Sequence, residues 1–362
     1  MTTMTKLISI FILTLSALTT HAQTDISQYL KTHHYSFTLD KGFDQPAIDT
    51  LKQKLGNYKL VLLGEGGSHF LKFYEPLRFV WVKFLSEHFG LTNFFMEFGH
   101  SSDILCNEFL QTGDTSFLPK ARFTAIKTFW NRLYLYNATQ PKGKQLKSFG
   151  IDFERTHSYC KALKLLLPSA EPPEKIKETI ELIKNSNDTL NDCDYIVSLN
   201  SKLKKAINDN SAEFQKYFAN KFSDVKQIVF NNGSCKDAQK NRNKNMAENF
   251  LSFDEKENDK IYYGQLGMAH TILKNKNTAS YLDENSKFKN KVCVVNTYCY
   301  NCSTPEEQVS NWQVHKIEPD ILKYFLPYCN SDFTLFDLSE NIELTKRYRA
   351  YGQFLIIAKN QN

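Results

Sequence analysis

The chain has 362 residues, which exceeds the ~250 to 300 residues that one hydrophobic core usually holds. Its formal net charge is +6, and the lysines are spread among acidic residues without a basic stripe interleaved with aromatic side chains. The composition therefore argues against nucleic-acid binding, and the length favours one large α/β domain with a helical insertion.

Residues 1–22 have the pattern of a secretory signal peptide. A single Lys6 precedes an apolar stretch, and Thr20-His21-Ala22 provides a small-x-Ala cleavage site. We therefore expect a mature chain of residues 23–362 that is exported, either to the periplasm or out of the cell. No later run is long enough to span a bilayer, so no membrane span is expected. The oligomeric state does not follow from the sequence.

Eight cysteines in an exported chain permit disulfide bonds, but they are too scattered for the dense framework of a small stapled domain. Cys299 and Cys302 are the only close pair. Because a zinc site of this type needs a second such pair, a local disulfide or two free thiols is the better interpretation. His33 and His34 have no other metal ligand near in sequence, so we expect a solvated turn there.

Residues 59–98 predict a strand, loop, helix and strand in succession. A continuous apolar run closed by Gly64 is typical of a buried parallel strand, and Glu65 lies at its end. Helical spacing of apolar residues follows, and Gly90 is placed to end that helix. A second apolar strand then leads into Glu97.

Parallel strands present their carboxyl ends to the crevice in which ligands bind. Glu65, His69 and Glu97 follow two such strands, so we expect these three side chains to share one site although they are far apart in sequence.

The rest of the chain continues the α/β pattern. We expect further helices over residues 43–55, 101–110, 122–136, 159–167 and 237–253, and further strands over residues 146–152, 260–263, 292–297, 333–338 and 353–358. The last two strands lack a clear crossover helix between them, so they are expected to be antiparallel. Prolines near residue 168 mark the start of a helical insertion or cap over residues 168–235. The predicted fold is therefore a mostly parallel sheet flanked by helices.

Several polar residues follow the predicted strands or face them. His100 lies next to the second strand end, and Asn107 can point from the following helix toward the site. Asp152 ends the third strand, where it would meet the other carboxylates as a partner for a His or Arg. His270 closes a loop over residues 264–270, whose Gly264 would let the backbone approach a ligand closely.

Short motifs occur in a recognisable order along the chain. They are Gly64-Glu65-Gly66-Gly67-Ser68-His69, Arg78, Phe95-Met96-Glu97 with Asn107 and Gly113, Phe129-Trp130-Asn131 with Tyr136-Asn137, Ser148-Phe149-Gly150-Ile151-Asp152, Arg242-Asn243-Lys244-Asn245-Met246-Ala247-Glu248-Asn249, and Gly264-Gln265-Leu266-Gly267-Met268-Ala269-His270. Together they resemble the signature of the erythromycin esterase family over roughly residues 59–273. The resemblance implies a hydrolase that acts on a carboxylic ester or lactone.

The resemblance also implies a set of site residues. The catalytic set is His69, Glu65, Glu97, His270, Arg78 and Arg242, with Asn107 and Asp152 as substrate contacts. His100 is added as a substrate contact because of its place next to the strand end. The chain departs from the family pattern at three places. His69 comes one residue later than the family's histidine, Asn243 stands where the family has Asp, and His270 is separated from Gly267 by two residues.

Ester hydrolysis by this set would need a neutral imidazole to take a proton from water, a carboxylate to orient it, and a cation to stabilise the oxyanion. His69 fits the base, Glu65 or Glu97 the orienting carboxylate, and Arg78 or Arg242 the cation. A Gly-x-Ser-x-Gly elbow is absent from the sequence, so a serine acyl-enzyme fits poorly.

Two alternatives remain open. Two His and two Glu could together hold a divalent metal, although their spacing is scattered and His-Glu-x-x-His is absent, so no metal or other cofactor is assigned. The displaced histidines also fit a secreted protein that binds a ligand in the same pocket without turnover. In each case the expected partner is a small molecule.

Overall fold

The computed structural model describes residues 26–66, 71–118, 124–189, 192–233, 235–236, 240–300, 323–341, 344 and 352–359. The predicted signal peptide, His69 with the rest of its loop, and Cys302 lie outside the described residues.

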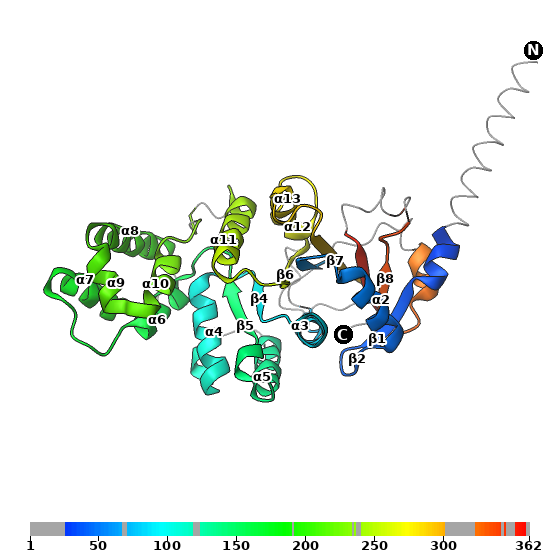
Figure 1. The fold of residues 1–362 in the computed structure, drawn as a ribbon, viewed down its shortest axis with the longest axis horizontal. Helices are drawn as coiled ribbons and strands as arrows, with labels where there is room; N and C mark the ends of the chain where they lie inside the picture. Colours follow the sequence, from blue (N-terminus) through cyan, green and yellow to red (C-terminus); the bar gives the residue numbers. More distant parts are fainter. Residues whose placement is uncertain are drawn as a thin grey trace, which may run out of the picture.

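One sheet organises the described part of the chain (Figure 1). Its nine strands have the order β2-β1-β8-β9-β7-β3-β6-β4-β5. Their bounds are β1 (His34–Thr38), β2 (Gly42–Phe43), β3 (Leu60–Glu65), β4 (Asn93–Met96), β5 (Lys147–Gly150), β6 (Tyr262–Gly267), β7 (Val292–Tyr300), β8 (Phe333–Asp337) and β9 (Phe354–Lys359). The six strands from β9 to β5 are parallel, whereas β8 is antiparallel to β9 and to β1. The predicted α/β class and the antiparallel final pair are confirmed.

The first two strands were not predicted. His34, which we expected in a solvated turn, begins β1, where it pairs with Phe336 of β8. The ring of His33 stacks on Tyr29, with ring centroids 3.9 Å apart. For His34 the expectation of a turn was wrong, because a local pattern cannot reveal pairing with β8, which lies about 300 residues further on.

Helices cover both faces of the sheet. Along β3, Val61 and Leu63 pack with α2 (Gln45–Leu55), α3 (Tyr74–Phe89) and α5 (Thr124–Ala138), whereas Leu60 and Leu62 pack with α11 (Arg242–Glu257) and α13 (Thr278–Glu284). Side chains alternate between the faces of a strand, so a strand buried on both sides reads as a continuous apolar run. The predicted end of α3 is confirmed, since Gly90 takes the left-handed conformation (φ +73°) and its N–H bonds the last turn.

A separate group of helices lies beside the β5 edge, drawn in green in Figure 1. It consists of α6 (Thr156–Leu166), α7 (Glu174–Lys184), α8 (Cys193–Asp209), α9 (Ser211–Phe218) and α10 (Phe222–Val229), and we call it the helical lobe. Isoleucines and leucines at helical spacing, such as Ile176 and Ile180, form its own core with α6. Leu105 of α4 (His100–Thr112) joins that core, so α4 connects the lobe to the sheet.

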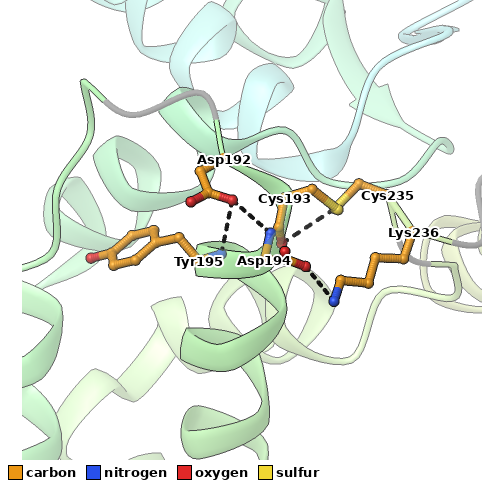
Figure 2. The surroundings of a disulfide bond; sticks show 6 residues. All are labelled: Asp192, Cys193, Asp194, Tyr195, Cys235 and Lys236. Carbon is orange, nitrogen blue, oxygen red and sulfur yellow. Dashed lines mark hydrogen bonds and ion pairs between the residues drawn. A yellow bond between two sulfur atoms is a disulfide. The ribbon is translucent and has the colours of Figure 1, made fainter.

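A disulfide ties the lobe to the segment that leads into α11. Cys193, at the start of α8, is bonded to Cys235, and an ion pair between Lys236 and Asp194 lies alongside (Figure 2). The carboxylate of Asp192 caps α8 by accepting from two backbone N–H groups. Cys299 is also disulfide-bonded, and the described free cysteines are buried. The Cys193–Cys235 bond therefore restrains the return path from the lobe to α11.

Replacing Cys193 and Cys235 with serine should lower the free energy of unfolding by about 2 to 4 kcal/mol, because the unfolded chain regains the freedom of a long closed loop. Urea unfolding under non-reducing conditions measures this. Cys235→Ser alone should lower the free energy of unfolding as much as the double variant does, since a single thiol cannot close the loop. Unchanged stability in both variants would show that the bond does not constrain the unfolded chain.

No helix in the described ranges is long and apolar enough to cross a membrane.

Candidate functional site

The described candidate residues gather at one edge of the sheet. Glu65 is the last residue of β3 and lies opposite Gly267, the last residue of β6. Glu97 directly follows β4, and Asp152 follows β5. Because these four strands are neighbours and parallel, their carboxyl ends meet at the same edge.

His270 is not in a loop, as was expected, but in the short helix α12 (Met268–Thr271). Strand β6 extends to Gly267 because it pairs in parallel with β3 along its whole length. Gly264 does not serve a ligand either, since a side chain there would lie 2.2 Å from the ring of Phe95. Because β6 ends at Gly267, α12 places His270 at the edge of the sheet formed by the carboxyl ends of the strands.

Arg242 connects these strand ends. Its Nη2 lies 2.5 Å from Oε1 of Glu97 and 2.7 Å from Oδ2 of Asp152, and its Nε donates to Oδ1 of Asp152 at 3.0 Å. Its Nη1 lies 3.5 Å from Nε2 of His270. We call Glu97, Asp152, Arg242, Asn243 and His270 the Arg242 cluster.

The Arg242 cluster is partly open to solvent. Asp152 is 1% exposed, whereas the side chain of Arg242 is 25% exposed and that of His270 13%. Burial alone would lower the pKa of Arg242, but the hydrogen bonds that it donates to Asp152 and the charges of Glu97 and Asp152 outweigh burial and raise that pKa. The guanidinium of Arg242 is therefore fixed in place and permanently charged beside the imidazole of His270.

Glu97 also binds the backbone at this edge. Its Oε2 accepts from the N–H of Gly267 at 3.0 Å, while its Oε1 lies 3.7 Å from Nε2 of His270. The carboxylate is therefore held between the end of β6, the imidazole and the guanidinium, and its position is set by three elements.

Glu65 and Arg78 belong to a second, buried group. Arg78 Nη2 lies 3.2 Å from Glu65 Oε1, and its Nη1 lies 2.5 Å from Glu75 Oε2. Gln265 of β6 donates to Glu65 Oε1 at 2.6 Å. Burial raises the pKa of Glu75, although the charge of Arg78 opposes that shift. We call Glu65, Glu75, Arg78 and Gln265 the Glu65 cluster.

Arg78 is therefore placed to hold Glu65 from within the core. It is 4% exposed, and two carboxylates face its Nη atoms. We expected Glu65 and Glu97 to share one site. They lie at the same edge of the sheet but in separate clusters, because β6 runs between β3 and β4.

Asn107 and His100 contact parts of the fold other than the Arg242 cluster. The amide of Asn107 donates to the backbone oxygen of Ser148 and accepts from its N–H, so it satisfies the open edge of β5. His100 begins α4, and its Nε2 lies 3.4 Å from Oδ1 of Asp224 in the helical lobe. Both residues join elements of the fold.

Sequence reasoning missed the residues that hold the loop of Asp152. Glu154 is buried and accepts from the N–H groups of His100 and Ser101, in place of a side-chain cap on α4. Asn231, which follows the helical lobe, donates to the backbone oxygen of Asp152 and to Glu154. The available signal was an acidic residue shortly after the end of a predicted strand.

In the part of the chain that the structure describes, no group of three or more His, Cys, Asp or Glu side chains has an arrangement that could hold a metal ion.

No family model matches the chain, and no curated protein matches it by sequence. Three solved structures share its fold. A Bacillus cereus protein from structural genomics is 18% identical, with 93% of this chain and 97% of that chain covered and a TM-score of 0.61. A succinoglycan biosynthesis protein is 16% identical, with 93% and 97% covered and a TM-score of 0.67.

The third is an erythromycin esterase, EreC, a histidine-to-asparagine variant in its open conformation. It is 13% identical, with 89% of this chain and 95% of that chain covered and a TM-score of 0.63. Identities this low establish a shared fold and no shared activity.

Proposed function

We propose that this chain is a hydrolase that cleaves a carboxylic ester or lactone at the carboxyl edge of the sheet. The observation that carries the proposal is the Arg242 cluster, in which an imidazole, two carboxylates and a guanidinium meet beyond β4, β5 and β6. The fold shared with an erythromycin esterase supports the choice of reaction class.

In the proposed reaction a histidine, His69 or His270, takes a proton from water while the water oxygen bonds to the carbonyl carbon. The carbonyl electrons move to oxygen and form an oxyanion. Collapse of this intermediate breaks the bond to the alcohol oxygen, which receives the proton from the imidazolium. An acid and an alcohol are released, and the histidine returns to its neutral form.

The two arginines have different tasks in this proposal. Arg242 is partly exposed, and its Nη1 faces His270, so it can stabilise the oxyanion next to the base. Arg78 is buried against Glu65 and Glu75, so it fixes Glu65 at the end of β3. Glu65 and Glu97 orient the histidines or the water.

We also propose that the protein works outside the cytoplasm after loss of residues 1–22. The Cys193–Cys235 disulfide supports this, because such bonds persist mainly in oxidising compartments. Mass spectrometry of protein expressed with its leader should find Gln23 as the first residue of the mature form. Retention of the leader in the purified protein would overturn the proposed export.

The test of the function is hydrolysis of a panel of simple esters and macrocyclic lactones by the purified mature protein, with His69→Ala measured beside it. We expect turnover to acid and alcohol, and a fall of about 10²- to 10⁴-fold in the variant if His69 is the base. Equal rates would leave His270 as the base. Tight binding without turnover would favour the ligand-binding alternative, and loss of activity on chelation would favour a metal-dependent hydrolase.

A further inference from the structure

We infer that Asn243 is a positioning residue that fixes the tautomer of the neutral His270 ring, with the proton on Nδ1 and the lone pair on Nε2. The inference rests on the proposed function, because it assigns a specific acceptor atom to the hydrolytic site. Asn243 is next to Arg242 in α11, and its Oδ1 lies 2.6 Å from Nδ1 of His270.

The orientation of the Asn243 amide follows from its other partners. Its Oδ1 also faces the hydroxyl of Thr278 at 3.0 Å and the backbone N–H of Thr278 at 3.3 Å. A backbone N–H can only donate, so the amide atom that faces it is the oxygen. The Nδ2 of Asn243 faces Oδ1 of Asn277 at 3.5 Å, which agrees with this orientation.

An amide oxygen can only accept, so the hydrogen bond to His270 requires a proton on Nδ1. The other side of the ring gives the same result. Nη1 of Arg242 lies 3.5 Å from Nε2, and a guanidinium can only donate. Oε1 of Glu97 lies farther from Nε2, at 3.7 Å, and it can only accept, so it opposes this tautomer. Asn243 and Arg242 favour the tautomer in which Nε2 accepts, which is the form that a general base needs.

The charges around His270 make the neutrality of Asn243 important. Within the described residues, Glu97 faces the ring from beyond β4, Arg242 faces it from α11 with Asp152 behind, and Glu65 ends the adjacent strand β3. Thr278, at the start of α13, is neutral. Glu97 favours the protonated ring and Arg242 opposes it. A carboxylate at position 243 would add a second negative charge and favour the protonated ring, which cannot act as a base.

Nuclear magnetic resonance of protein labelled with ¹⁵N-histidine tests the inference without any turnover. The His270 signals are identified by their absence from His270→Gln. At alkaline pH we expect a protonated Nδ1 and an unprotonated Nε2 in the native protein. A proton on Nε2 instead would overturn the inference.

Asn243→Asp is a nearly isosteric change that adds the charge. We expect the His270 titration, and the acidic limb of the pH profile of kcat/KM on the best ester, to move to higher pH by about 1 to 3 pH units. Asn241→Asp adds the same charge at the exposed N-cap of α11, where the native side chain makes no capping hydrogen bond. This control should shift neither the His270 titration nor the pH profile.

An unmoved titration in Asn243→Asp would also overturn the inference. The resonance measurements separate this from failure of the proposed function. If the protein showed the expected tautomer and titration shift but hydrolysed no ester, the role of Asn243 would stand and the proposed hydrolase function would be wrong.

Discussion

Arg242→Ala should lose ester hydrolysis by about 10²- to 10³-fold, the cost of removing one oxyanion donor. It should also lower the free energy of unfolding by about 3 kcal/mol, the lower end of the range for breaking a buried ion pair, because Arg242 is partly exposed. The variant leaves Glu97 and the buried Asp152 without the cation that lies between them. Steady-state kinetics and urea unfolding measure the two effects.

Arg155→Ala is the matched control. Arg155 is 49% exposed, and its Nη2 lies 3.9 Å from the same carboxylate of Asp152. An exposed pair of this kind contributes less than about 1 kcal/mol, so we expect little change in stability. If both arginine variants were equally stable and equally active, the Arg242 cluster would have no special role.

Asp103→Asn should stabilise the protein at neutral and alkaline pH. Asp103 lies in the first turn of α4 and is fully buried. Burial raises its pKa to about 8, and the charge of Glu154 adds to the shift. At pH 7 folding must therefore neutralise a carboxylate that is ionised in the unfolded chain. The amide removes this cost, which amounts to about 4 kcal/mol at most.

The sign of the pH dependence is fixed by the raised pKa. Below the unfolded value of 3.8 the carboxyl is protonated in both states, so native protein and Asp103→Asn should be similarly stable. The native protein should lose stability relative to the variant as the pH rises from about 4 to 8, and the difference should then stay constant.

Urea unfolding of both proteins across pH 4 to 9 measures this difference. Asp114→Asn is the control, because Asp114 is exposed and the N–H of Ser116 lowers its pKa. In that control no stabilisation should develop with rising pH. A difference between native protein and Asp103→Asn that does not depend on pH would contradict the account of Asp103.

Local patterns predicted much of the sheet. The apolar runs that end in Glu65 and Glu97 are β3 and β4, and the expected later strands correspond to β5 to β9. The structure also brings Asp152 and Arg242 together, from motifs about 90 residues apart. Such pairs can be anticipated because the carboxyl ends of parallel strands converge whatever loops separate them.

The order of the strands in the sheet could not be predicted from the sequence. Periodicity shows that a strand exists but not which strands are its neighbours, and the insertion of β6 between β3 and β4 separates Glu65 from Glu97. It also places Gln265, a buried polar residue within an apolar strand, against Glu65. The polar contacts of Asn243, Glu154 and Asn231 join distant segments, so a local pattern could not reveal them.

The most direct test of the hydrolytic Arg242 cluster is kcat/KM of native protein and His270→Ala on the best ester of the panel, at matched concentration. The account predicts measurable hydrolysis by the native protein and a loss of about 10²- to 10⁴-fold in the variant. Equal values for the two proteins, or no hydrolysis of any ester by the native protein, would contradict it.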